Sequence, residues 1–137
     1  MIVIYFYWID LGCSVEITEP DPFYSAVFIN KTLLNLYIHN AKTLGVPFND
    51  AHVRPSLLVS TDMGNISQIK PSIHPMYKIA TEGANHTEEF THSVNQPENQ
   101  LPTLNAAKSM AMSAVDVLCK PDLMAQINDD FKSGSYE

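Results

Sequence analysis

The sequence of 137 residues has little of what nucleic-acid binding, membrane insertion or a disulfide scaffold would require. Eight Lys and Arg stand against 15 Asp and Glu, and the formal net charge of −7 disfavours binding to a phosphate backbone. No apolar run approaches the ~20 residues of a membrane-spanning helix. The two cysteines, Cys13 and Cys119, lack the spacing of metal ligands and favour a reducing compartment, the cytoplasm. We therefore expect no nucleic-acid partner and no membrane partner.

What the chain does contain is apolar side chains, at 45% of its residues, which indicates a globular domain or a piece of one. The first nine residues, Met1 to Ile9, carry no charge and are rich in β-branched and aromatic side chains. This composition favours a buried strand, and it lacks the basic region and cleavage site of a secretory signal. The alternative is a truncated or misjoined start, because such a segment requires a partner surface.

Short apolar or alternating runs predict several further strands, at 13–18, 57–59, 66–73 and 76–79. Pro71 lies inside the third run and marks it as an edge strand, because proline cannot donate to a ladder. With the helices described next, these strands predict an α/β fold, in which a sheet is flanked by helices.

Helical periodicity is clear in three segments, at 32–44, 103–119 and from Pro121 to about Phe131. Asn30 or the pair Lys31–Thr32 is placed to cap the first helix and Gly45 to end it, and Thr87 caps a further short helix. The helix at 103–119 has an apolar stripe whose small residues predict close packing against a sheet. The stripe consists of Leu104, Ala107, Ala111, Ala114, Val115 and Leu118.

Four residues are candidates for a functional site. His86 follows a Gly-Ala-Asn turn and precedes a helix start, where a scaffold can hold a metal ligand with little freedom. Asp62 and Asn65 follow the predicted strand at 57–59, the usual place for ligand-binding groups, although Asp and Asn are also turn formers. His74 precedes a proline that restricts it to extended geometry, so its ring points either into a site or onto the surface.

Several stretches together are similar to the C-terminal part of one enzyme family. They are GCSVEI (12–17), NKTLLNLY (30–37), STDMGNIS (60–67), PSIHPMY (71–77), EGANHTEEF (82–90) and the Ala-rich helix from Thr103. Their order and spacing resemble those of the aminoacylase/carboxypeptidase-type metallohydrolases, peptidase family M-twenty. The likeness runs from about Gly12 to Phe131.

The resemblance implies a two-domain enzyme. Its catalytic α/β domain, of the zinc-exopeptidase type, holds two metal ions, usually zinc, and its ferredoxin-like lid often dimerises. On that map residues 1–19 would be a remnant of the lid or dimerisation domain, with its last strand at 12–17. Residues 20–137 would be the C-terminal part of the catalytic domain. A homo-oligomer formed through the lid is the implied assembly.

The implied chemistry is metal-assisted hydrolysis of the amide bond in dipeptides or N-acyl amino acids. His86 matches the family's last metal-binding histidine, and Asp62, Asn65 and His74 would line the substrate. The early His-x-Asp motif and the glutamate pair that supplies the general base are absent, and Glu88-Glu89 does not replace that pair because it follows His86. The chain therefore has no catalytic residue of its own and one zinc ligand at most, so we expect a truncated enzyme that is inactive alone.

Two alternatives remain open. The chain would be a non-catalytic binding or regulatory piece if it associates with full-length subunits through a sheet edge or its apolar N-terminus. It would be an artefact of gene prediction if it does not fold stably, and a cooperative thermal transition would exclude that alternative.

Overall fold

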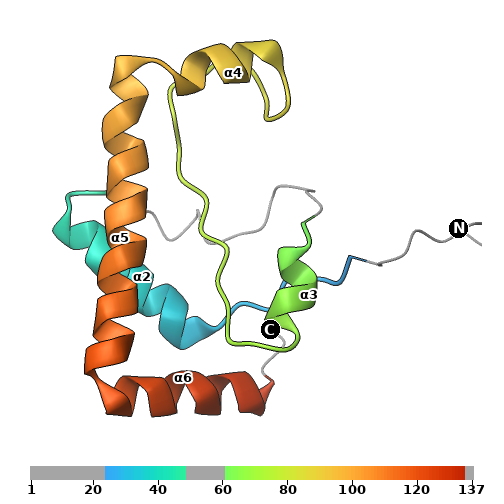
Figure 1. The fold of residues 1–137 in the computed structure, drawn as a ribbon, viewed down its shortest axis with the longest axis vertical. Helices are drawn as coiled ribbons and strands as arrows, with labels where there is room; N and C mark the ends of the chain where they lie inside the picture. Colours follow the sequence, from blue (N-terminus) through green and yellow to red (C-terminus); the bar gives the residue numbers. More distant parts are fainter. Residues whose placement is uncertain (1–23, 49–60, 135–137) are drawn as a thin grey trace, which may run out of the picture.

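The computed structural model describes residues 24–48 and 61–134 (Figure 1). The described residues are mainly helical, and no strand occurs among them. The elements are α2 (Lys31–Thr43), α3 (Met63–Ser67), α4 (Glu88–Val94), the 3₁₀ helix η2 (Pro97–Asn99), α5 (Gln100–Cys119) and α6 (Pro121–Ser133). The prediction of an α/β fold, with a sheet flanked by helices, is therefore wrong for this part of the chain.

The two predicted strands that fall within the described ranges, 66–73 and 76–79, show why. The first begins inside α3, and the second belongs to an irregular segment that leads from α3 toward α4 (Figure 1). Pro71 and Pro75 remove two backbone donors from this segment, and a strand forms only where a neighbour accepts its ladder bonds. The expectations for Met1–Ile9, for 13–18 and 57–59, and for a domain boundary after residue 19 lie outside the described residues.

A distant side chain and a distant backbone N–H take the place of a neighbouring strand. The Asn99 amide brackets Ala80: its Oδ1 accepts the Ala80 N–H at 2.7 Å and its Nδ2 donates to the Ala80 carbonyl at 2.9 Å. At the other end, the Asn30 N–H donates to the Ser72 carbonyl at 2.9 Å. These bonds satisfy both backbone groups of Ala80 at one end of the segment and the carbonyl of Ser72 at the other.

The predicted helices are confirmed. The Asn30 Oδ1 accepts the Leu33 N–H at 3.0 Å and so caps α2. Gly45 takes a φ of +77° directly after the helix C-cap, a conformation that glycine adopts without strain. The helix predicted at 103–119 begins three residues earlier, because Pro102 falls in its first turn, where a backbone N–H has no acceptor in any case.

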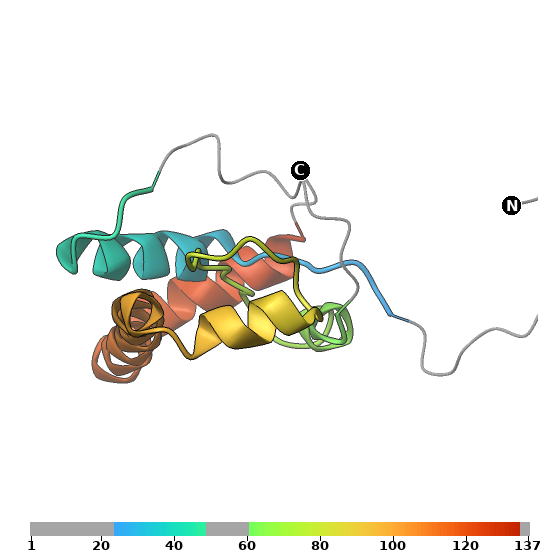
Figure 2. The same cartoon turned by 90° about the horizontal axis from the view of Figure 1, so that it is seen from above.

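α2, α5 and α6 pack on one another, and we call them the three-helix core. Figures 1 and 2 show that α4 and α6 leave opposite ends of α5 toward the same side. The buried apolar side chains are Phe28, Tyr37, Ala41 and Ile127. The ring of Phe28 meets that of Phe131 edge to face at 6.1 Å, and burial raises the pKa of the Tyr37 phenol.

None of the helices in the described ranges is long and apolar enough to cross a membrane.

Buried polar side chains join these helices over long sequence separations. The Asn30 Nδ2 donates to the Ile127 carbonyl at 3.0 Å, and the Thr32 N–H at the start of α2 donates to the Asp130 carboxylate at 2.9 Å. A carboxylate at that position also complements the helix dipole. In the middle of α2, the Asn40 Nδ2 donates to the Ser113 hydroxyl at 3.2 Å. Directed hydrogen bonds therefore connect the helices of the core in addition to its apolar contacts.

α3 is attached to the segment that precedes α2. A Cβ built on Gly64 would lie 1.7 Å from the Ser25 carbonyl oxygen, so only glycine allows this approach. The Ser67 hydroxyl, which is fully buried, accepts the Phe28 N–H at 2.8 Å. The glycine and serine of the STDMGNIS stretch thus serve the packing of α3 against residues 25–28.

Candidate functional site

His86 lies in an exposed loop, residues 81–87, that precedes α4. Within the described ranges it is the non-glycine residue with a positive φ, at +70°. Asn, Asp and His are the non-glycine residues that adopt this left-handed conformation most often, so the backbone at His86 is that of a turn which a histidine accepts.

The loop is held by the cap of α4. The Thr87 hydroxyl accepts the Phe90 N–H at 3.2 Å and donates to the Ala84 carbonyl at 2.8 Å. Gly83 packs closely against the first turn of α4, because an added Cβ would lie 2.7 Å from both the Glu89 Cβ and the Thr87 Oγ1. These contacts fix the two ends of the turn that carries His86, as the sequence context suggested.

The three residues predicted to line a substrate have different surroundings. Asp62 and His74 are exposed, and Asp62 is the residue before α3 without capping it through its side chain. Asn65 is half-buried, and its Oδ1 accepts the Ser25 N–H at 2.8 Å. Asn65 therefore has a structural role in addition to any contact with substrate.

A complete metal site is not formed by the described residues. Across 24–48 and 61–134 no group of three or more His, Cys, Asp or Glu side chains is placed to hold an ion. His86 therefore does not fit a metal ion by itself, because a stable site needs several deprotonated donors. Glu88 and Glu89 are exposed in the first turn of α4, as expected of carboxylates near a helix N-terminus.

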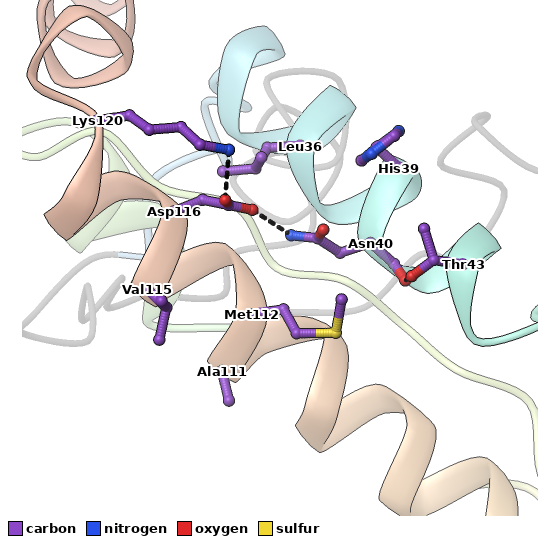
Figure 3. A pocket seen from close by; sticks show the side chains of 9 residues that line it. All are labelled: Leu36, His39, Asn40, Thr43, Ala111, Met112, Val115, Asp116 and Lys120. Carbon is purple, nitrogen blue, oxygen red and sulfur yellow. Dashed lines mark hydrogen bonds and ion pairs between the residues drawn. The ribbon is translucent and has the colours of Figure 1, made fainter.

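A groove of about 530 Å³ lies between α2 and α5 (Figure 3), and no motif in the sequence indicates it. It contains none of the four predicted site residues. Its charged groups bind one another: the Asp116 carboxylate accepts from the Asn40 Nδ2 at 3.0 Å and pairs with Lys120. The hydrogen bond from Lys120, followed by that from Asn40, lowers the pKa of the Asp116 carboxyl. The polar groups of the groove thus stabilise the helix pair and leave no evident ligand-binding arrangement.

Two curated proteins match this chain, and both are hydrolases of dipeptidase type. They are the Xaa-Arg dipeptidases of Homo sapiens, 40% identical, and of Mus musculus, 41% identical, each over 122 residues. The match covers 88% of this chain and 28% of the length of each relative. No protein-family profile matches the chain. The resemblance to the dipeptidases of peptidase family M-twenty is confirmed: this chain is related to them over little more than a quarter of their length.

Proposed function

We propose that this chain is the part of a dipeptidase-type amidohydrolase that contributes His86 to the metal site, and that it hydrolyses no substrate by itself. The observation that carries the proposal is the 40% identity to the human Xaa-Arg dipeptidase over 88% of the chain. The substrate class that follows is a dipeptide with C-terminal arginine or a related N-acyl amino acid. The exposed free thiol of Cys119 favours a reducing compartment, and we propose the cytoplasm as the location of the complete enzyme.

The geometry of the His86 loop supports this role. Its imidazole is exposed, and the Thr87 cap and the close packing at Gly83 hold the turn in place. A metal ligand gains from such restriction, because less freedom is lost when the ion binds. Zinc would act as a Lewis acid on the scissile amide when bound, with its remaining ligands supplied from outside the described residues. Asp62, His74 and Asn65 would face the substrate in the completed enzyme.

The test is a chimera in which the matching residues of this chain replace the 122 residues of the human Xaa-Arg dipeptidase that align with them. We expect the chimera to release arginine from Xaa-Arg dipeptides in the presence of zinc, and the chain alone to release none. Turnover by the pure chain would contradict the proposed inactivity. A folded chimera without turnover would contradict the proposed function.

The role of His86 is tested in the chimera by His86→Asn. Asparagine tolerates the left-handed backbone at this position, so the substitution removes the imidazole and keeps the loop. We expect turnover to fall at least about 100-fold, because even groups that only support a metal ligand are worth 10- to 100-fold. His92→Asn is the matched control, since His92 is exposed in the last turn of α4. Equal activity of the two variants would refute the assignment of His86.

A second candidate function is that of a non-catalytic piece that binds full-length subunits. Large apolar side chains exposed on several helices favour it, among them Val94 on α4, Met110 on α5 and Met124 on α6. Co-expression with the complete human relative, followed by size-exclusion chromatography, distinguishes the two functions. A stable complex with an unchanged turnover number would support a binding role, whereas a free monomer would contradict it.

A further inference from the structure

The side chain of Asn99 is fully buried at the point where η2 meets α5. It occupies the N-cap position of α5, where an asparagine ordinarily accepts a hydrogen bond from a backbone N–H of the first helical turn. The Asn99 side chain does not make this bond. The longest helix of the described chain thus begins without the cap that its own sequence offers, which indicates another role for this amide.

The Asn99 amide instead connects two separate points of the backbone. Its Oδ1 accepts the Ala80 N–H at 2.7 Å, and its Nδ2 donates to the Ala80 carbonyl at 2.9 Å and to the Ser93 carbonyl at 2.7 Å. Both N–H groups of the amide and its oxygen are therefore used. A carboxylate of the same shape could not make these bonds, because it accepts hydrogen bonds and donates none.

The two points lie on either side of His86 in the sequence. Ala80 directly precedes the arm formed by residues 81–96, and Ser93 belongs to the last turn of α4 within this arm. α4 buries no residue, so apolar packing contributes little to the attachment of the arm. The placement of the arm relative to α5 therefore depends on the three hydrogen bonds of Asn99.

We propose that Asn99 is a positioning residue for His86, because its amide closes the base of the arm that carries this imidazole. Within the arm, the Thr87 cap holds the loop on α4, and Asn99 then joins α4 and Ala80 to the start of α5. Loss of the amide releases the arm and leaves the three-helix core, which is held by other bonds, intact. This inference rests on the proposed function only in taking His86 as the group that needs a fixed position.

Asn99→Asp in the full chain separates positioning from helix capping. Aspartate caps a helix as well as asparagine does, but it cannot donate to the two carbonyls. Asn105→Asp is the matched control, since it makes the same change in charge in the second turn of α5. We expect Asn99→Asp to increase the rate of amide hydrogen exchange in α4 at least about tenfold, because a helix of this length is unstable without attachment. The control should change this rate by less than about twofold, and exchange in α2 and α6 should stay as in the parent.

Two further measurements complete the test. Asn99→Ala introduces no buried charge and removes no cap that α5 uses, so it should increase exchange in α4 as much as Asn99→Asp does. In the chimera described above, both variants should lower kcat for Xaa-Arg dipeptides at least about tenfold and change KM little. The reason is that a displacement of about 1 Å in a positioned group can cost about 100-fold in rate.

Equal exchange in α4 for Asn99→Asp and Asn105→Asp would overturn the positioning role. Faster exchange throughout α2 and α6, or loss of the cooperative urea transition, would assign Asn99 to the stability of the whole fold. Faster exchange in Asn99→Ala with none in Asn99→Asp would make Asn99 an ordinary cap of α5. An arm that opens in a chimera of unchanged kcat would show that His86 needs no fixed position. Because exchange is measured in the chain alone, an inactive parent chimera would refute the proposed function and leave the attachment of the arm by Asn99 standing.

Discussion

The three-helix core and the arm formed by residues 81–96, which includes α4, are stabilised in different ways. In the core, hydrogen bonds link residues that are up to 98 positions apart, as between Thr32 and Asp130. Within the arm, the side-chain hydrogen bonds span two to four positions, as between Thr87 and Phe90, and α4 buries no residue. The core is therefore cooperative, whereas the arm is a local structure attached to it.

The arm is nevertheless the region that presents His86. A local structure defined by caps and turns can hold a side chain in a fixed conformation without a hydrophobic core beneath it. It can also open at low cost in free energy, because few buried contacts oppose the opening. The residues that stabilise this chain thus lie in the three-helix core, whereas the candidate metal ligand His86 lies in the arm. Variants in the two regions should therefore differ in their effect on stability.

The largest effect should come from Asn30→Ala in the core. The substitution removes the cap of α2 and the hydrogen bond from Asn30 to the buried Ile127 carbonyl. We expect a loss of about 2–4 kcal/mol in the free energy of unfolding, measured by urea denaturation. Asn30→Ser should lose about half as much, since serine still caps a helix. Thr87→Ala removes the corresponding cap in the arm and should leave the global unfolding transition unchanged. If it lowered the free energy of unfolding as much as Asn30→Ala does, the proposed difference between core and arm would be wrong.

A smaller effect, of unusual sign, is expected for Gly64→Ala. Replacing glycine by alanine inside a helix usually stabilises by about 1 kcal/mol. Here the new methyl group would overlap the Ser25 carbonyl oxygen, so we expect a net destabilisation of roughly 1–3 kcal/mol. Gly83→Ala is the corresponding glycine substitution in the arm. It should increase the rate of amide hydrogen exchange in α4 and leave the midpoint of urea-induced unfolding unchanged. A stabilised Gly64→Ala variant would contradict the close approach of α3.

The smallest effect concerns the pH dependence of the core. The pKa of Asp116 is lowered in the folded chain, chiefly by its hydrogen bond with Lys120. Its stabilising contribution is therefore fully present above the ordinary pKa of 3.8 and is lost as the pH falls through the lower folded pKa. We expect Lys120→Met to raise the Asp116 pKa and to weaken the acid dependence of unfolding, followed from pH 2 to 6. An unchanged dependence would show that the pair contributes nothing.

The helices could be predicted to within a few residues because their signals are local. Caps, prolines and the periodicity of apolar residues are read from adjacent positions, as at Asn30, Gly45 and Pro121. The strands at 66–73 and 76–79 were wrong because a strand depends on a neighbour that the local sequence does not reveal. The alternation of apolar and polar side chains in these segments suggested pairing with another strand. Instead, the Ser72 carbonyl accepts a hydrogen bond from the Asn30 N–H, and the Ala80 N–H donates to the Asn99 side chain.

The candidate site was predictable only in part. The turn before α4 and its cap followed from the sequence around His86, but its left-handed backbone did not. The roles of His86, Asp62, Asn65 and His74 in binding metal or substrate stay predictions. The bond from Asn65 to the backbone of Ser25, 40 positions away, has no signature in the sequence.

The four longer helices α2, α4, α5 and α6 and the relationship to the dipeptidases could be read from the residues alone, because these depend on neighbouring residues or on motifs in order, whereas the short α3 could not. Only the tertiary structure decided which face of α5 is buried. An apolar stripe predicts a core-facing side, yet the hydrogen bonds of Ser109, Ser113 and Asn40 turn the other side inward. A helix buries the face for which a partner exists, and α2 offers hydrogen-bonding groups to the polar face of α5, so that face is the one turned inward.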